Sequence, residues 1–232
     1  MFDNVTKSVR VLSAAAVEKA NSGHPGMPLG MADVGVAIYK NALKASNKNP
    51  DWINRDRFVL SAGHGSMLLY SLLHFNGFDI SMNDIKNFRQ LGSVTAGHPE
   101  KDFQLGIDTT TGPLGQGFAN GVGLAVAERY LSTVLGEDII DHYIYGIVSD
   151  GDLMEGISTE AAELAGFWNL GKIIYFFDDN NISIDGNVTK VSITNQKNKF
   201  LSMGWDVLEI DGHKESEIID AINHAQKITD KP

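Results

Sequence analysis

Two stretches decide the fold of this chain, Tyr143-Ile-Tyr-Gly-Ile-Val-Ser-Asp-Gly-Asp-Leu-Met-Glu-Gly156 and Lys172-Ile-Ile-Tyr-Phe-Phe-Asp-Asp-Asn-Asn181. Each begins with an apolar run that is typical of a buried strand and ends in polar residues. The segment between them is long enough for one helix and a turn, which is the connection that joins neighbouring parallel strands. The carboxyl ends of parallel strands lie at the same edge of a sheet, so Asp150 and Asn180 are expected to come together there.

The residues at these strand ends favour a site for a metal ion and a diphosphate. Mg²⁺ takes oxygen ligands and commonly bridges a protein to phosphate oxygens, and Asp150 and Asn180 supply such oxygens. A helix that begins just after Asp150-Gly151 would point free backbone N–H groups at an anion, and Gly151 would let that anion approach. The alternative is an ordinary Asp-Gly turn followed by an Asn-Asn loop. Either dipeptide alone fits that alternative, whereas the combination favours the site.

The remaining pattern predicts an α/β fold. Strands are predicted at 57–61, 142–148, 172–178 and 205–210. Helices are predicted from Val5 to Gly23, at 28–43, at 66–75, from Ser81, and at 113–135, 153–168, 194–203 and 215–227. Strands that alternate with helices indicate a doubly wound, mostly parallel sheet with helices on both faces, built as a single domain over 1–232.

Three segments carry more specific expectations. Ser81 and Asp84 have the spacing of a helix-capping pair. Residues 91–112 lack periodicity and suggest a functional loop. The helix at 113–135 is rich in glycine, which weakens a helix by up to about 1 kcal/mol per residue relative to alanine. We therefore expect this helix to be packed very closely, in the core or at a subunit contact.

Composition narrows the function classes. The 232 residues include 43% hydrophobic residues, enough for a full core, and no cysteine, which excludes disulfides and thiolate metal sites. A formal net charge of −10 argues against nucleic acid as a partner. It also predicts that an anionic cofactor binds only with a metal ion. No secretory signal is visible, and no apolar stretch approaches the ~18 residues that span a bilayer, so a cytoplasmic protein without a membrane partner is expected.

The motifs resemble those of the transketolase family. The stretches 150–158 and 178–186 are similar to its thiamine diphosphate-binding motif, an Asp-Gly element followed about thirty residues later by Asn. The segments 21–32, 61–70, 97–100 and 109–117 resemble further signatures of this family and occur in its order. The resemblance covers essentially the whole chain, and it implies the α/β fold of thiamine diphosphate-binding domains.

The resemblance implies a role for particular residues. Asp150, Asn180 and the backbone carbonyl of Ile182 would bind the metal, which would be Mg²⁺, with Ca²⁺ or Mn²⁺ as alternatives. Ser149 stands where the family usually has glycine, which adds a Cβ near the approach of the diphosphate. The residues implied to contact the cofactor are His64, Gly112, Leu114, Asp150, Gly151 and Asn180.

Histidines and one glutamate complete the implied site. His24 and His98 would face the substrate hydroxyls and carry protons, since small shifts move a histidine pKa across neutral pH. Glu155 resembles the family's buried glutamate near the subunit interface, but an acid in the first turn of a helix explains it equally well. The remaining four histidines are expected to be structural: His74, His142, His213 and His224.

The implied reaction transfers a two-carbon ketol group from a ketose phosphate to an aldose phosphate. The resemblance also implies a homodimer and a pyrimidine-binding domain, on the same polypeptide or as a separate subunit. On this interpretation the chain is C-terminally incomplete, lacks that domain and the C-terminal domain, and is inactive alone. The alternatives are a dihydroxyacetone synthase-like relative that uses formaldehyde, and a non-catalytic assembly subunit.

Overall fold

A three-stranded parallel sheet forms the centre of the computed structural model, which describes residues 2–184 and 186–232. Its strands are β1 (Arg57–Leu60), β2 (Ile144–Ser149) and β3 (Ile173–Asp178), in the order β1-β2-β3. Ser149 is the register partner of Asp178, so β2 and β3 end side by side. The three strands predicted at 57–61, 142–148 and 172–178 are thereby confirmed.

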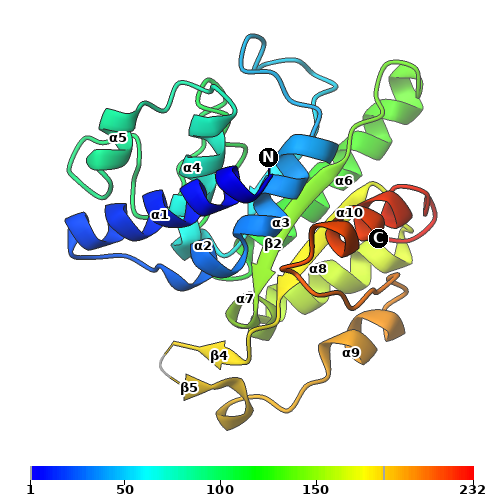
Figure 1. Cartoon of the computed structure of the whole chain (residues 1–232). Helices are drawn as coiled ribbons and strands as arrows, with labels where there is room; N and C mark the ends of the chain where they lie inside the picture. The colour runs from blue at the N-terminus through cyan, green and yellow to red at the C-terminus, as the bar shows by residue number, and fades with distance from the viewer. Residues whose placement is uncertain (1, 185) are drawn as a thin grey trace.

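Helices cover both faces of this sheet, as Figure 1 shows with α6 and α8 on one side of the strands and α1 and α4 on the other. Alternate strand residues divide between the two cores: Phe58 and Leu60 pack in the core that includes α1, α3, α4 and α10, while Val59 packs in the core that includes α6 and α8. This alternation follows from the two-residue period of a strand. The predicted doubly wound α/β architecture is confirmed.

The bounds of the helices and of the small antiparallel hairpin are α1 (Phe2–Ala20), α2 (Gly26–Gly30), α3 (Ala32–Ala37), η1 (Ile38–Ala42), η2 (Gly63–Gly65), α4 (Ser66–Phe75), α5 (Met82–Lys86), α6 (Gln116–Leu135), α7 (Asp150–Met154), α8 (Gly156–Phe167), β4 (Ile182–Ser183), β5 (Gly186–Asn187), η3 (Val188–Lys190), α9 (Gln196–Ser202) and α10 (Glu215–Ala225).

The glycines of α6 allow the close packing that the sequence predicts. A Cβ atom on Gly117 would lie 2.5 Å from Cα of Ser61, and one on Gly121 would lie 1.9 Å from the hydroxyl oxygen of Tyr175. Both distances are too short for a side chain, so these two positions require glycine. Gly123 differs, because a Cβ there would meet no described atom within 4 Å. The tight contacts therefore place one face of α6 in the core of this chain.

Two helices predicted as continuous are interrupted. The segment 28–43 is divided between α2, α3 and the π-helical turn η1, with a break at Met31 (φ −94°, ψ 11°). The segment 153–168 is interrupted at Glu155, whose extended backbone (φ −70°, ψ 136°) separates α7 from α8. The prediction of a capping pair at α5 is confirmed: Ser81 N–H donates to Asp84 at 2.8 Å and Asp84 N–H donates to Ser81 Oγ at 3.2 Å.

The strand predicted at 205–210 is wrong. Within the described residues, β3 pairs only with β2, and 205–210 has no strand partner. An open cavity of about 700 Å³ is lined both by β3 and by residues 205–210, including Phe177, Trp205 and Leu208. A strand needs a hydrogen-bonded neighbour, and this segment lines the cavity instead of pairing with β3. The segment is held instead by Trp205 Nε1, which donates to the carbonyl of Ala162 at 2.8 Å.

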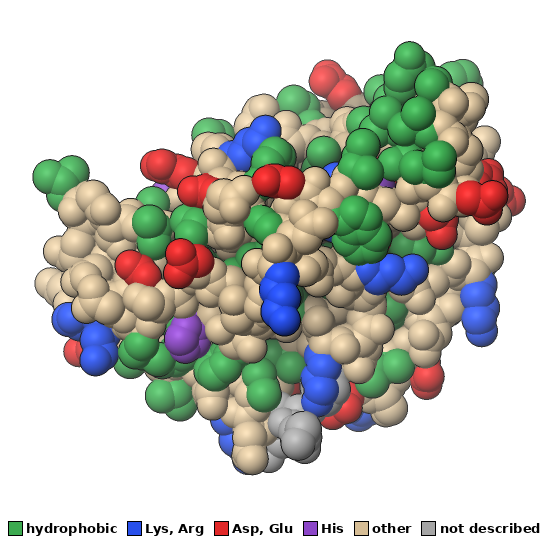
Figure 2. Space-filling view, turned by 90° about the horizontal axis from the view of Figure 1, so that it is seen from above, with side chains coloured by type: hydrophobic (Ala, Val, Ile, Leu, Met, Phe, Trp, Pro, Cys, Tyr) green, Lys and Arg blue, Asp and Glu red, His purple; other side chains and the backbone are tan. Residues whose placement is uncertain are grey.

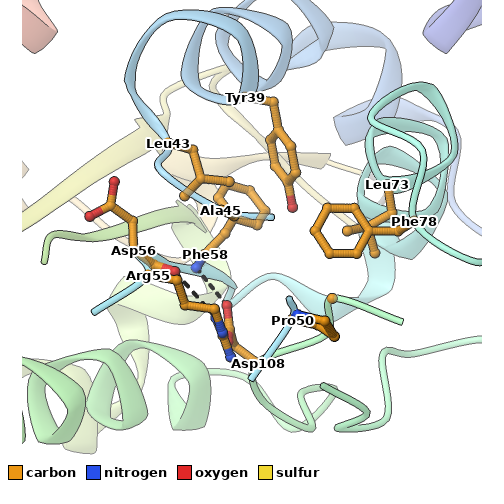
Figure 3. Close-up of a pocket in the computed structure, with 11 residues that line it drawn as sticks. Tyr39, Leu43, Ala45, Pro50, Arg55, Asp56, Phe58, Leu73, Phe78 and Asp108 are labelled. Carbon is orange, nitrogen blue, oxygen red and sulfur yellow. Dashed lines mark hydrogen bonds and ion pairs between the residues drawn. The ribbon is translucent and has the colours of Figure 1, made fainter. Parts of the chain in front are cut away.

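A much smaller cavity of about 10 Å³ lies beside β1, and Figure 3 shows its lining. Arg55 Nη1 lies 2.6 Å from Asp108 Oδ1, and Phe58 N–H donates to Asp108 Oδ2 at 2.8 Å. The space suffices for about one water molecule. It is therefore part of the structural core and not a place for a cofactor.

The surface adds two observations. On the face shown in Figure 2, Lys and Arg side chains are scattered among acidic, apolar and uncharged groups. In the parts of the chain that the structure describes, no helix has both the length and the apolar character that a membrane span requires.

Candidate functional site

Asp150 lies at the carboxyl end of β2 and begins α7. The residue is only 6% exposed, and its Oδ2 is buried without a hydrogen-bond partner among the described residues. Burial, together with the nearby charges of Asp179 and Asp178, raises the pKa of the Asp150 carboxyl to about 6. A bound cation would supply the missing partner and offset the repulsion among the three carboxylates. The site therefore fits a divalent metal ion.

The other two predicted metal ligands lie at the same edge. Asn180 follows β3, and its Oδ1 accepts a hydrogen bond from Ile182 N–H at 2.9 Å. β4, which begins at Ile182, contacts α7. Among the described residues there is no cluster of three His, Cys, Asp or Glu side chains arranged to hold a metal. A metal here would consequently depend on amide and carbonyl oxygens as well as on Asp150, and the set of Asp150, Asn180 and Ile182 stays a prediction.

Three of the predicted histidines and a loop glycine come together from separate segments. The rings of His24 and His64 are 5.2 Å apart between centroids and meet edge to face. A Cβ atom on Gly112 would lie 3.2 Å from the ring of His98. Burial lowers the pKa of His64, and the neighbouring His24 lowers it further; burial is also the main cause that lowers the pKa of His98. Both shifts favour the neutral form of the ring, which is able to accept a proton.

The loop that carries Gly112 and Leu114 packs against the turn that follows β2. A Cβ atom on Gly151 would lie 2.9 Å from Cδ1 of Leu114, so the leucine occupies the space that a side chain at 151 would fill. Gly115, with φ of +79°, ends this loop at the start of α6. The structure thus brings the predicted loop contacts beside Asp150-Gly151.

Asp152 is the site residue that the sequence reasoning missed. Its side chain is fully buried, and its two oxygens accept four hydrogen bonds. Oδ1 accepts from Ser61 Oγ at 3.0 Å and from Gly115 N–H at 2.9 Å. Oδ2 accepts from the N–H and the hydroxyl of Ser149 at 3.0 and 3.2 Å. The Ser-x-x-Asp spacing before an apolar residue, which correctly predicted the cap at Ser81, was also present here and could have indicated this residue.

These bonds also show how Ser149 is accommodated. Its backbone is extended, at φ −123° and ψ 172°, which any residue can adopt. Its hydroxyl is turned toward Asp152. The serine therefore does not need the conformational freedom of the glycine that the family usually has.

Glu155 is exposed and lies between α7 and α8, at the N-cap position of α8, without a side-chain capping bond. It is not in the first turn of one continuous helix, as the alternative explanation assumed. Its suggested role at an interface stays a prediction.

The four histidines expected to be structural lie outside the His24, His64 and His98 group. His142 is buried, and burial lowers its pKa to about 4. The other three make polar contacts, which are His74 with the carbonyl of Ile80, His213 with Asp33 and His224 with Asp206.

Residues 2–232 match the family described as transketolase, thiamine diphosphate binding domain. The chain is 52% identical over 232 residues to transketolase 1 of Escherichia coli (strain K12), and the match covers 98% of this chain and 35% of that protein. It is 52% identical over 229 residues to transketolase of Bacillus subtilis (strain 168), which covers 97% of this chain and 34% of that protein.

Solved structures agree with the sequence matches. A transketolase from Leishmania mexicana superposes with a TM-score of 0.96 at 42% identity, over 100% of this chain and 35% of that one. A transketolase from Campylobacter jejuni superposes with a TM-score of 0.95 at 50% identity, over 99% and 36%. The chain thus spans about a third of the length of these relatives. The fold, the grouping of the motif residues at one edge of the sheet and these matches lead to one conclusion: the chain belongs to the transketolase family and corresponds to its thiamine diphosphate-binding domain.

Proposed function

We propose that this chain holds the diphosphate end of thiamine diphosphate, through a divalent metal ion, in a transketolase. The observation that carries the proposal is the buried, unpartnered Oδ2 of Asp150 at the edge where β2 and β3 end. Asp150, Oδ1 of Asn180 and the carbonyl of Ile182 would bind the metal. The Asn180 oxygen retains a second lone pair beside the bond it accepts from Ile182. Mg²⁺ fits this all-oxygen set, as do Ca²⁺ and Mn²⁺.

Other residues of the chain would hold and orient the cofactor. His64 and the Gly112–Leu114 loop would contact the cofactor. Leu114 packs against Gly151, and the start of α7 there would present backbone N–H groups to a phosphate oxygen. When bound, thiamine diphosphate supplies the nucleophilic carbon to which a ketose phosphate gives up its two-carbon ketol group. Positioning this group against the sugar phosphate is the part of the reaction that these residues perform.

His24 and His98 are proposed to bind the substrate hydroxyls. His24 is exposed and His98 half-buried, so both rings are accessible from solvent. The lowered pKa of His98 favours its neutral ring, and a neutral imidazole can take a proton from a hydroxyl and return it. This supports the proton-carrying role.

The activity is proposed for the complete protein and not for these residues alone. The chain spans about a third of its relatives' length, and a pyrimidine-binding domain is proposed to complete the site, on the same polypeptide or as a separate subunit. A homodimer with sugar phosphates as substrates is part of the same proposal. The 232 residues by themselves are expected to bind the cofactor weakly and to show no ketol transfer.

The test is the variant Asp150→Asn in the complete protein, which keeps the side-chain volume and removes the charge. Calorimetric titration with thiamine diphosphate at fixed Mg²⁺ should show affinity lowered by at least about 100-fold, since even indirect supports of a metal ligand contribute 10- to 100-fold. The matched control is Asp220→Asn, an exposed carboxylate on α10, which should bind as the unmodified protein does. Unchanged affinity and an unchanged Mg²⁺ requirement in Asp150→Asn would overturn the proposal.

A further inference from the structure

We propose that Asp152 is a positioning residue for the diphosphate end of the site, an inference that rests on the proposed function. It would fix the Gly112–Gly115 loop and the end of β1 against the Asp150-Gly151 turn. None of its four hydrogen bonds is to a residue proposed to bind the cofactor or metal. Asp152 would therefore act indirectly, by holding in place the backbone of the segments that carry the cofactor-binding residues.

The geometry supports a joint among three segments far apart in the chain. Ser61 directly follows β1 and lies three residues before His64, Gly115 directly follows Leu114, and Ser149 directly precedes Asp150. The Asp152 carboxylate bonds to all three, at 3.0, 2.9 and 3.0 Å. Each predicted cofactor contact on these segments thus lies within three residues of a bond to the same carboxylate. A displacement of this carboxylate would move all of them together.

A fourth segment is held from the other side. Ser158 is buried and its hydroxyl donates to the backbone carbonyl of Asp152 at 2.6 Å, which ties α8 to α7 across the break at Glu155. A Cβ atom on Gly115 would lie 2.9 Å from this same Ser158 hydroxyl oxygen. The loop, the turn and α8 are therefore packed closely around Asp152.

The chemistry explains why a carboxylate is suited to this position. All four hydrogen-bonding partners are donors, two N–H groups and two hydroxyls, and an ionised carboxylate only accepts. Hydrogen bonds to a charged acceptor are roughly twice as strong as those between neutral groups. An amide in the same place would turn an N–H₂ group toward one pair of donors, so Asp152→Asn breaks that pair while leaving the volume unchanged.

The test compares Asp152→Asn with the control Asp84→Asn, which alters the matching Ser-x-x-Asp pair at the surface helix α5. In the complete protein we would titrate thiamine diphosphate, and separately inorganic pyrophosphate, at fixed Mg²⁺, and measure ketol transfer at saturating cofactor. For Asp152→Asn, the Kd of both ligands should rise by about 10-fold, the size of one lost hydrogen bond to a charged group. The kcat at saturating cofactor should fall by less than about 2-fold, and Asp84→Asn should change neither quantity.

A purely structural role would lower the melting temperature of Asp152→Asn while leaving both Kd values unchanged, and that result would overturn the inference. If Asp152→Asn does not fold, Ser61→Ala, which removes one donor, takes its place and should raise both Kd values by about 3-fold. Unchanged values in Ser61→Ala would equally overturn the inference. If the unmodified protein binds neither ligand, the proposed function itself fails. If the unmodified protein binds both ligands and the variants bind them equally tightly, only the positioning role fails.

Discussion

Two helices of five residues, α5 and α7, begin with the same Ser-x-x-Asp sequence. In both, the serine N–H donates to the aspartate three residues later, at 2.8 Å from Ser81 to Asp84 and at 3.0 Å from Ser149 to Asp152. The backbone of both serines is extended, as a helix start requires. Local sequence therefore produces the same local structure in both places.

The two aspartates differ in what lies beyond the helix. The carboxylate of Asp84 is partly exposed and bonds to Ser81. Asp152 is fully buried and bonds in addition to Ser61 and Gly115, which belong to other segments. The comparison teaches that a capping pair becomes a tertiary joint when the sheet edge brings further donors to its carboxylate.

The largest expected effect is the difference between Asp152→Ala and Asp84→Ala in how far each lowers the free energy of unfolding. Asp152→Ala leaves several buried donors without an acceptor and should lower that free energy by about 3–5 kcal/mol, as the loss of a buried charged partner does. Asp84→Ala removes only a helix cap and should lower it by about 1 kcal/mol. Urea denaturation followed by circular dichroism measures both. Equal losses in the two variants would show that Asp152 is no more than a cap.

The second effect concerns the backbone that Asp152 holds. Gly115 and Gly92 have the same left-handed φ of +79°, but a Cβ atom on Gly115 would lie 2.7 Å from Cβ of Glu155, whereas one on Gly92 would meet no described atom within 4 Å. Alanine at either position would have to adopt the left-handed backbone conformation, which lowers the free energy of unfolding by about 1–2 kcal/mol. Gly115→Ala adds a clash of about 1–3 kcal/mol. Gly92→Ala is the control, and urea denaturation that gave equal losses would mean that the loop yields freely at Gly115.

This pair of glycines also shows how far the sequence carries the fold and the site. Apolar runs of one strand length were sufficient to locate β1, β2 and β3, and their polar ends identified Asp150 and Asn180, because these features depend on local pattern. Gly92 and Gly115 look alike in sequence, and only the packing of α8 against the loop distinguishes them. Asp152 was missed for the same reason, since its importance arises from donors that lie far away in the chain.

The incorrect strand at 205–210 has a related cause. It is an apolar run of one strand length, but strand formation depends on a neighbour, and 205–210 has no strand partner among the described residues. A glycine adjoins each of the breaks at Met31 and Glu155, namely Gly30 and Gly156, and glycine weakens a helix. Periodicity therefore predicts which segments are apolar on one face, while tertiary contacts decide whether a segment pairs as a strand.

The smallest effect comes from Glu128, a third carboxylate that sharpens the comparison with Asp152. Glu128 lies on α6 and is 4% exposed. The pKa of Glu128 is raised to about 7, mainly because the side chain is buried. The nearby Lys172 lowers the pKa but offsets only part of the effect of burial. Asp152 is buried among four hydrogen-bond donors, whereas the burial of Glu128 disfavours the charged form of its carboxyl group.

The sign of the pH effect follows from this shift. The ordinary pKa of a glutamate is 4.5, so between pH 4.5 and 7 the native state binds a proton that the unfolded state has released. The contribution of Glu128 to stability is therefore fully present below about pH 4.5 and is lost as pH rises through about 7. Glu128→Gln, which cannot ionise, should be more stable than the unmodified protein at pH 8 by about 1 kcal/mol, after allowance for solvent screening, and equally stable at about pH 4.

Urea denaturation at about pH 4 and pH 8 measures this difference, and Glu163→Gln, at an exposed position on α8, serves as the control that should show none. If Glu128→Gln gained nothing at pH 8, the charged form of the Glu128 carboxylate would have to be stabilised by its neighbours. The contrast between a carboxylate surrounded by donors and one that is merely desolvated would then disappear, and burial alone would not distinguish the acids of this chain.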